Sequence, residues 1–286
     1  MKRIIKLLLI VLITVGCTSC IKTDSMENIN IITTIYPIEY VLTNLYGEDS
    51  IINSIYPDGV NIDEYKLSEK EYNDFIKKDL FVYNGLGKDR DIAKNLLNKN
   101  NKLLIMDASF GMEYEYGIEE LWLNPSNLLM MSQNIKNGLF EFIESSIIKD
   151  KIKKNYDSLK VSLSELDASI KLLNEQANNK TLIVASPALN FLSKYGFNII
   201  NISDNPDKAK EVVNATKLIN DGTIKYIFIL EGEEDSKALA QIKKETKVEM
   251  IEIKKVNNLT DEERDNKKDY ISLMETNIEL LRKGIK

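Results

Sequence analysis

The chain has 286 residues, and its 38 Lys and Arg against 44 Asp and Glu give a formal net charge of −6 at pH 7. It contains no histidine and only two cysteines, which excludes imidazole-based catalysis, histidine-ligated zinc or haem, and a four-cysteine zinc site. The acidic balance disfavours nucleic acid as a partner, because neutralising phosphates needs a basic face.

The N-terminus has the features of a secretory signal. Three basic residues precede a short apolar run, residues 7–15. This run is too short to span a membrane comfortably, and small residues follow it. We therefore expect residues 1–16 to be a signal peptide rather than a membrane anchor.

The end of this signal resembles a bacterial lipobox, in which a small residue precedes a cysteine that is lipidated and becomes the new N-terminus. Gly16-Cys17 fits the pattern, so we expect lipidation at Cys17 and a tether over residues 17–28. Cys20 is a rival lipidation site. A plain secretory peptide with a Cys17–Cys20 disulfide is the alternative.

Beyond the tether, short β-branched runs alternate with amphipathic patterns, which is typical of β/α units with a mostly parallel sheet. In the first half the pattern predicts strands at residues 29–35, 51–55, 80–83 and 103–106. It predicts helices at residues 38–45, 68–77, 89–97 and 126–143.

The pattern changes between residues 146 and 178, where there is no Gly or Pro and apolar residues recur in steps of three and four. This predicts one amphipathic helix about 45–50 Å long, at about 1.5 Å per residue. The alternation then resumes, with predicted strands at 181–185, 197–202, 226–230 and 248–253 and helices at 207–219, 236–246 and 270–283.

The predicted fold class is therefore α/β, with two lobes that each hold a mostly parallel sheet flanked by helices, joined by one long α-helix. The first lobe is expected over residues 29–145, the linking helix over 146–178 and the second lobe over 179–286. Such a helix should resist wide hinge opening, so we expect small lobe shifts on ligand binding rather than a clamshell motion.

Five segments, in this order and around this helix, resemble the metal-binding receptors of bacterial zinc and manganese ABC transporters, which are extracytoplasmic solute-binding lipoproteins. The segments are residues 33–37 (TTIYP), 57–65 (PDGVNIDEY), 79–85 (DLFVYNG), 121–125 (LWLNP) and 269–274 (DYISLM). The resemblance implies a monomeric receptor, not an enzyme, that captures a divalent metal ion for an ABC permease and its ATPase. It also implies an extracytoplasmic location on the bacterial cell membrane, held by the lipid anchor only.

At the metal-ligand positions that the resemblance implies, this sequence departs from the family. Asp63 stands where the first ligand loop normally supplies a histidine, and Glu120 stands where a second histidine is usual. The third ligand normally follows a serine, but Ser186 is followed here by Pro187, which offers no donor. The final aspartate is present as Asp269.

If the fold holds, Asp63, Glu120 and Asp269 would present three carboxylates to one cleft. Such oxygen ligands suit Mn²⁺ or Ca²⁺ better than Zn²⁺, although the identity of the ion stays open among the three. The alternative is a cleft that has lost its metal, with these acids simply solvated. Further residues expected to line the cleft are Tyr36, Tyr65, Ser186 and Glu231, and we expect Trp122 to pack at the lobe interface.

Three other functions remain open at this stage. Pro187 motivates a divergent receptor of the same fold that takes a non-metal or chelate ligand, because the change removes a ligand and opens space. A surface adhesin without a transport role is a second possibility. A hydrolase that uses paired acids is the weakest, because nothing in the sequence fixes the carboxyl separation that such chemistry needs.

Overall fold

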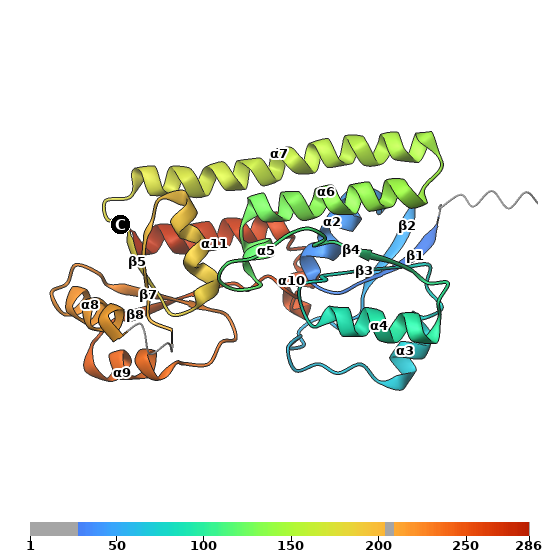
Figure 1. Cartoon of the computed structure of the whole chain (residues 1–286). Coiled ribbons are helices and arrows are strands. Elements are labelled where there is room, and N and C mark those ends of the chain that lie inside the picture. The colour runs from blue at the N-terminus through green and yellow to red at the C-terminus, as the bar shows by residue number, and fades with distance from the viewer. Residues whose placement is uncertain (1–27, 204–208, 286) are drawn as a thin grey trace, which may run out of the picture.

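The computed structural model describes residues 28–203 and 209–285 (Figure 1). The predicted signal peptide, Cys17, Cys20 and almost all of the tether lie outside the described residues. Within these residues, no helix is both long and apolar enough to cross a membrane.

The first lobe is built on a four-stranded sheet with the order β2-β1-β3-β4, in which every pairing is parallel. Its strands are β1 (Ile29–Thr33), β2 (Ser50–Ser54), β3 (Leu80–Tyr83) and β4 (Leu104–Asp107). The central strands are buried, as expected for a parallel sheet covered on both faces. The helices of this lobe are α2 (Tyr36–Tyr46), α3 (Glu69–Phe75), α4 (Asp89–Lys99), α5 (Glu120–Leu123) and α6 (Pro125–Phe142).

The predicted long helix is α7 (Ser146–Gln176), which runs along both lobes (Figure 1). Ser145 caps its N-terminus by accepting a hydrogen bond from the amide of Ile148. Its 31 residues correspond to about 46 Å at ~1.5 Å per residue. Every apolar position of the predicted stripe is buried, so this face packs on the helices below it.

The second lobe repeats the topology, with the strand order β6-β5-β7-β8 and parallel pairing throughout. Its strands are β5 (Thr181–Val184), β6 (Asn198–Asn201), β7 (Tyr226–Leu230) and β8 (Glu249–Ile253). Its helices are the 3₁₀ helix η1 (Pro187–Tyr195), α8 (Ala209–Asn220) and α9 (Lys237–Glu245). The predicted fold class is confirmed, and each of the eight predicted strands is present among the described residues.

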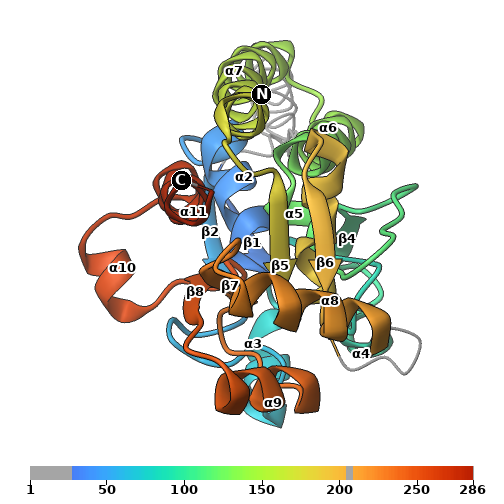
Figure 2. The same cartoon turned by 90° about the vertical axis from the view of Figure 1, so that its left-hand side faces the viewer.

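After β8 the chain crosses back to the first lobe. We call residues 254–260 the return segment; it leads to the short helix α10 (Asp261–Asp265) and then to α11 (Tyr270–Gly284). In the end-on view, α11 lies beneath α7 and beside α2 (Figure 2). The elements that the sequence analysis did not predict are α5, η1 and α10, which are short and carry no long apolar repeat.

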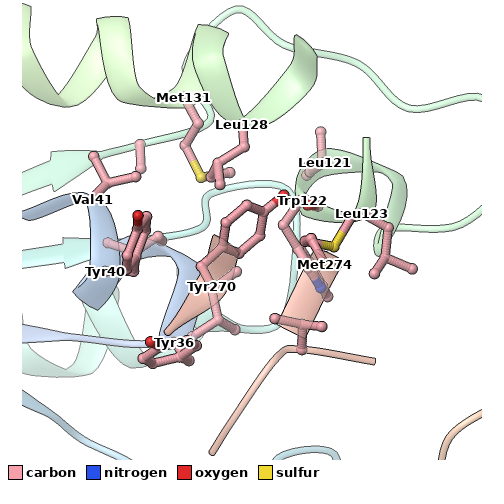
Figure 3. Packing of buried hydrophobic residues seen from close by; sticks show 14 of the residues in the cluster. Tyr36, Tyr40, Val41, Leu121, Trp122, Leu123, Leu128, Met131, Tyr270 and Met274 are labelled. Carbon is pink, nitrogen blue, oxygen red and sulfur yellow. Dashed lines mark hydrogen bonds between the residues drawn. The ribbon is translucent and has the colours of Figure 1, made fainter. Parts of the chain in front are cut away.

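Tyr270, the first residue of α11, packs among buried residues that include Tyr40, Leu128 and Met131 of the first lobe (Figure 3). It is fully buried, its ring centroid lies 5.5 Å from that of Tyr40, and its hydroxyl donates to the carbonyl oxygen of Trp122 over 2.6 Å. Trp122 is 3% exposed, which confirms its predicted packing role. The start of α11 is therefore anchored in the first lobe.

The packing of α7 gives a test of this fold. Ile152 is fully buried whereas Val161, on the same helix, is 56% exposed. Ile152→Ala should lower the free energy of unfolding by about 2–5 kcal/mol, because it leaves a cavity. Val161→Ala should change it by no more than about 0.5 kcal/mol. Urea denaturation followed by circular dichroism measures both, and equal effects would contradict the burial of this face.

Candidate ligand site between the lobes

The candidate site lies where the loop that follows β2 of the first lobe and the carboxyl end of β7 of the second lobe face the return segment. Ligands of open α/β sheets bind outside the carboxyl ends of the strands, which is where this site lies. A pocket of about 260 Å³ is present here. It is lined by residues 59–63, 257–260, Glu231, Gly232, Lys255 and Glu263.

The return segment is hydrogen-bonded to the first lobe along most of its length. The bonds are Tyr36 N–H to Asn257 O (2.9 Å), Gly59 N–H to Leu259 O (2.7 Å), Asn258 Nδ2 to Pro57 O (2.8 Å) and Trp122 Nε1 to Lys255 O (2.8 Å). Most of these groups belong to the main chain. The loop that carries Asp63 (residues 57–65, the first ligand loop) and the return segment therefore form one structural unit.

Val256 adopts a left-handed backbone conformation within this unit, with φ at 55°. This conformation is rare for a β-branched residue and costs about 1–3 kcal/mol, so the surrounding contacts must hold it. The Val256 side chain is 2% exposed. Its burial, with the hydrogen bonds on either side, holds the main chain next to Lys255 in place.

Asp63 lies between two ammonium groups. Lys255 Nζ is 2.9 Å from its carboxylate, and Lys88 Nζ is 4.0 Å away. Lys255 also lies 3.2 Å from Glu119. Burial by itself lowers the pKa of Lys255, but the hydrogen bond to Asp63 and the charge of Glu119 outweigh it, so this pKa is raised. Lys255 thus stays charged and joins two carboxylates.

Glu120 has a different environment. Its side chain is 1% exposed and forms an ion pair with Lys194 of η1, in the second lobe. Its other carboxylate oxygen accepts the amides of Glu115 and Tyr116. These contacts leave Glu120 as a buried link between the lobes.

Asp269 is the N-cap of α11. Its carboxylate accepts the amide of Ser272 over 2.8 Å, and the Ser272 hydroxyl accepts the amide of Asp269, which completes a capping box. The side chain of Asp269 therefore stabilises a helix start.

The structure accordingly does not bring together the three carboxylates that the resemblance assigned to one metal ion. Among the described residues there is no group of three or more acidic or cysteine side chains placed to hold a metal. The physical reason is that lysines or main-chain amides already satisfy Asp63, Glu120 and Asp269 separately.

The residues expected to line the cleft are dispersed as well. Glu231 lines the pocket and binds Lys254 over 2.9 Å. Ser186 is fully buried and donates to Glu233 over 2.9 Å. Tyr36 is 5% exposed within the core, and Tyr65 donates to Glu71 on α3 over 2.5 Å. Of these four residues, Glu231 is the one that lines the pocket.

Four charged residues near the pocket were not predicted from the sequence: Lys88 and Lys255, which contact Asp63, Glu119, which contacts Lys255, and Glu233, which interacts electrostatically with Glu119 and Lys255. Burial, despite the Ser186 hydrogen bond, and repulsion by Glu119 raise the pKa of Glu233. No local signal could have identified Lys255, because its partner Asp63 lies 192 positions away in the sequence.

Comparison with known proteins identifies the family. The protein-family model described as ZnuA, the periplasmic component A of a zinc-uptake complex, matches residues 31–284. The chain belongs to this family. Its description is that of an uptake component rather than an enzyme.

Individual relatives agree with this assignment. The zinc-binding lipoprotein AdcA of Streptococcus pneumoniae is 26% identical over 311 residues, covering 99% of this chain and 61% of the relative. A metal ABC transporter substrate-binding lipoprotein of Lactococcus lactis is 26% identical, covering 95% and 93%. The chain spans about half the length, 55%, of AdcA from Streptococcus pyogenes.

Solved structures show the same fold. The Zn(II)-bound ZnuA-like domain of Streptococcus pneumoniae AdcA superposes with a TM-score of 0.73 at 25% identity, covering 90% of this chain and 99% of that domain. A metal-dependent lipoprotein of Bacillus subtilis superposes with a TM-score of 0.74 at 19% identity, covering 90% and 99%.

Asp89, below the Asp63 loop, provides a test of the local electrostatics. It is 4% exposed and accepts the Tyr56 hydroxyl over 3.1 Å, and burial raises its pKa. A carboxyl whose pKa is raised on folding costs stability when it is ionised. Asp89→Asn should therefore stabilise the protein at pH 7. This gain should shrink as the pH falls through the raised pKa toward the unfolded value of about 3.9.

Urea unfolding of the wild type and of Asp89→Asn at pH 7 and at pH 5 measures this difference. Asp91→Asn, on the exposed side of α4, is the control and should show no such trend. A gain that grows as the pH falls would contradict the burial of an ionised Asp89.

Proposed function

We propose that this chain is the substrate-binding component of an ABC transporter and captures a divalent metal ion between its two lobes. The observation that carries the proposal is the family match over residues 31–284, together with a polar pocket between the lobes that the family's first ligand loop lines. The bound ion would pass to the permease and its ATPase. The protein would act by binding and docking and not by catalysis.

The site that supports this function best is the place now held by the Lys255 ammonium. Asp63 reaches it from the first ligand loop, Glu119 reaches it from the start of α5, and the charge of Glu233 acts on it as well. Carboxylate oxygens suit Mn²⁺ and Ca²⁺, whereas Zn²⁺ gains from nitrogen and sulfur ligands. The zinc-binding relatives keep Zn²⁺ as a candidate all the same.

The proposed location follows from the lipoprotein relatives and from the sequence around Cys17. A lipid on Cys17 would hold the protein at the outer face of the cell membrane, and the tether would let it reach the permease as a monomer. Gly16-Cys17 and the lipoprotein names of the relatives support this location.

Metal analysis and calorimetric titration of the full-length chain, purified in detergent without a histidine tag, test the proposal. We expect Mn²⁺, Zn²⁺ or Ca²⁺ to bind with a stoichiometry of one. Asp63→Asn should weaken binding by at least about tenfold, since even second-layer partners of metal ligands are typically worth 10–100-fold.

Asp269→Asn is the matched control for this experiment. The same chemical change removes one carboxylate, but asparagine is an equally good N-cap, so the start of α11 should stay intact. Its metal affinity should match that of the wild type. Absence of binding at millimolar concentrations of all three ions, or equal losses in the two variants, would contradict the proposed site.

A further inference from the structure

We infer that the ammonium of Lys255 is an internal competitor of the transported cation, which holds Asp63 and Glu119 in the unloaded protein and must leave before an ion can bind. This inference rests on the proposed function and adds a residue that sets the affinity of the site. Lys255 would thereby determine how much free metal is needed for loading.

The main chain of Lys255 is held on both sides, so its side chain starts from a defined position. The amide of Lys255 donates to Glu231 over 3.1 Å, and its carbonyl oxygen accepts from Trp122 over 2.8 Å. The next residue, Val256, is buried in a left-handed conformation. The Lys255 side chain is 16% exposed, so it is held inward and does not extend into solvent.

A cation cannot share these oxygens with the ammonium, because two positive charges a few ångströms apart repel each other. Capture therefore requires the ammonium to withdraw, which the flexible four-carbon stem of lysine permits. Lys88 cannot readily replace it. Its ammonium is 4.0 Å from Asp63 and is bound to the carbonyl oxygen of Ile62.

Lys254 is a built-in control. It precedes Lys255 in the return segment and carries the same charge, but its ammonium binds Glu231 (2.9 Å) and Glu263 (3.1 Å). Removing the charge of Lys254 changes the net charge of the region by the same amount. It does not free Asp63 or Glu119.

The first measurement is calorimetric titration of Mn²⁺ and of Zn²⁺ into the full-length wild type and into Lys255→Met, Lys255→Arg and Lys254→Met. An ammonium that occupies the site nine-tenths of the time would weaken the apparent affinity about tenfold. Lys255→Met should therefore bind about tenfold more tightly than the wild type. Lys255→Arg and Lys254→Met should stay close to the wild type.

The second measurement needs no metal. Hydrogen exchange of the amides in residues 59–65 should be faster in Lys255→Met than in the wild type or Lys254→Met, because Asp63 loses its partner. Unchanged exchange elsewhere in Lys255→Met would show that the variant is folded.

The outcomes separate the inference from the proposed function. If the wild type binds metal and Lys255→Met binds it equally or more weakly, the inference is overturned and the proposed function stands. If Lys255→Met binds metal and the wild type does not, the inference is supported and the wild type is not a metal receptor. If no variant binds metal, both are overturned, even where exchange in residues 59–65 is faster in Lys255→Met.

Discussion

The hydrogen bonds that hold the return segment against the first lobe are the constraint on which the arrangement of the two lobes depends. The segment leaves the sheet of the second lobe, yet its main chain pairs with Tyr36 and Gly59 of the first. Arg264, just beyond it, binds Glu39 and Asp58 of the first lobe as well. With α7 and α11 running along both lobes, wide opening would break these bonds, so the expectation of small lobe shifts fits the observed contacts.

The absence of histidine helps to explain the charge distribution between the lobes. A chain without histidine has carboxylates, Asp63 and Glu120, at these positions, and a carboxylate removed from water needs a cation or hydrogen-bond donors beside it. Here lysines supply those cations: Lys255 serves Asp63 and Glu119, and Lys194 serves Glu120. The first of these amines belongs to the return segment, whose main chain is hydrogen-bonded to the first lobe.

The sequence was sufficient to predict the fold but not the site, for a physical reason. Strands and long helices follow from local periodicity, so β1 to β8 and α7 were all predicted near their observed places. The helices η1 and α10 are single short elements, stabilised by caps and by tertiary contacts that no local pattern reveals. The partner of a charged side chain is harder still to predict from the sequence, because the pairs Asp63–Lys255 and Glu120–Lys194 join residues 192 and 74 positions apart.

Carrying ligand positions over from a family assumes that the surroundings of each position are also carried over. Two of the three positions in this chain, Glu120 and Asp269, show where that assumption fails. At Glu120 the side chain is buried in an ion pair, and at Asp269 it caps a helix. The neighbouring Trp122 and Tyr270 are both buried and are joined by a hydrogen bond. The contacts that build the core thus involve other side chains than the polar contacts at these two acids. Asp63 differs from the buried Glu120 because 62% of its side chain is exposed, and from Asp269 because its main partner is a lysine amine rather than a main-chain amide. The exchange of one cation for another that we propose for this site therefore needs an exposed carboxylate with an amine partner, and Asp63 combines these two features.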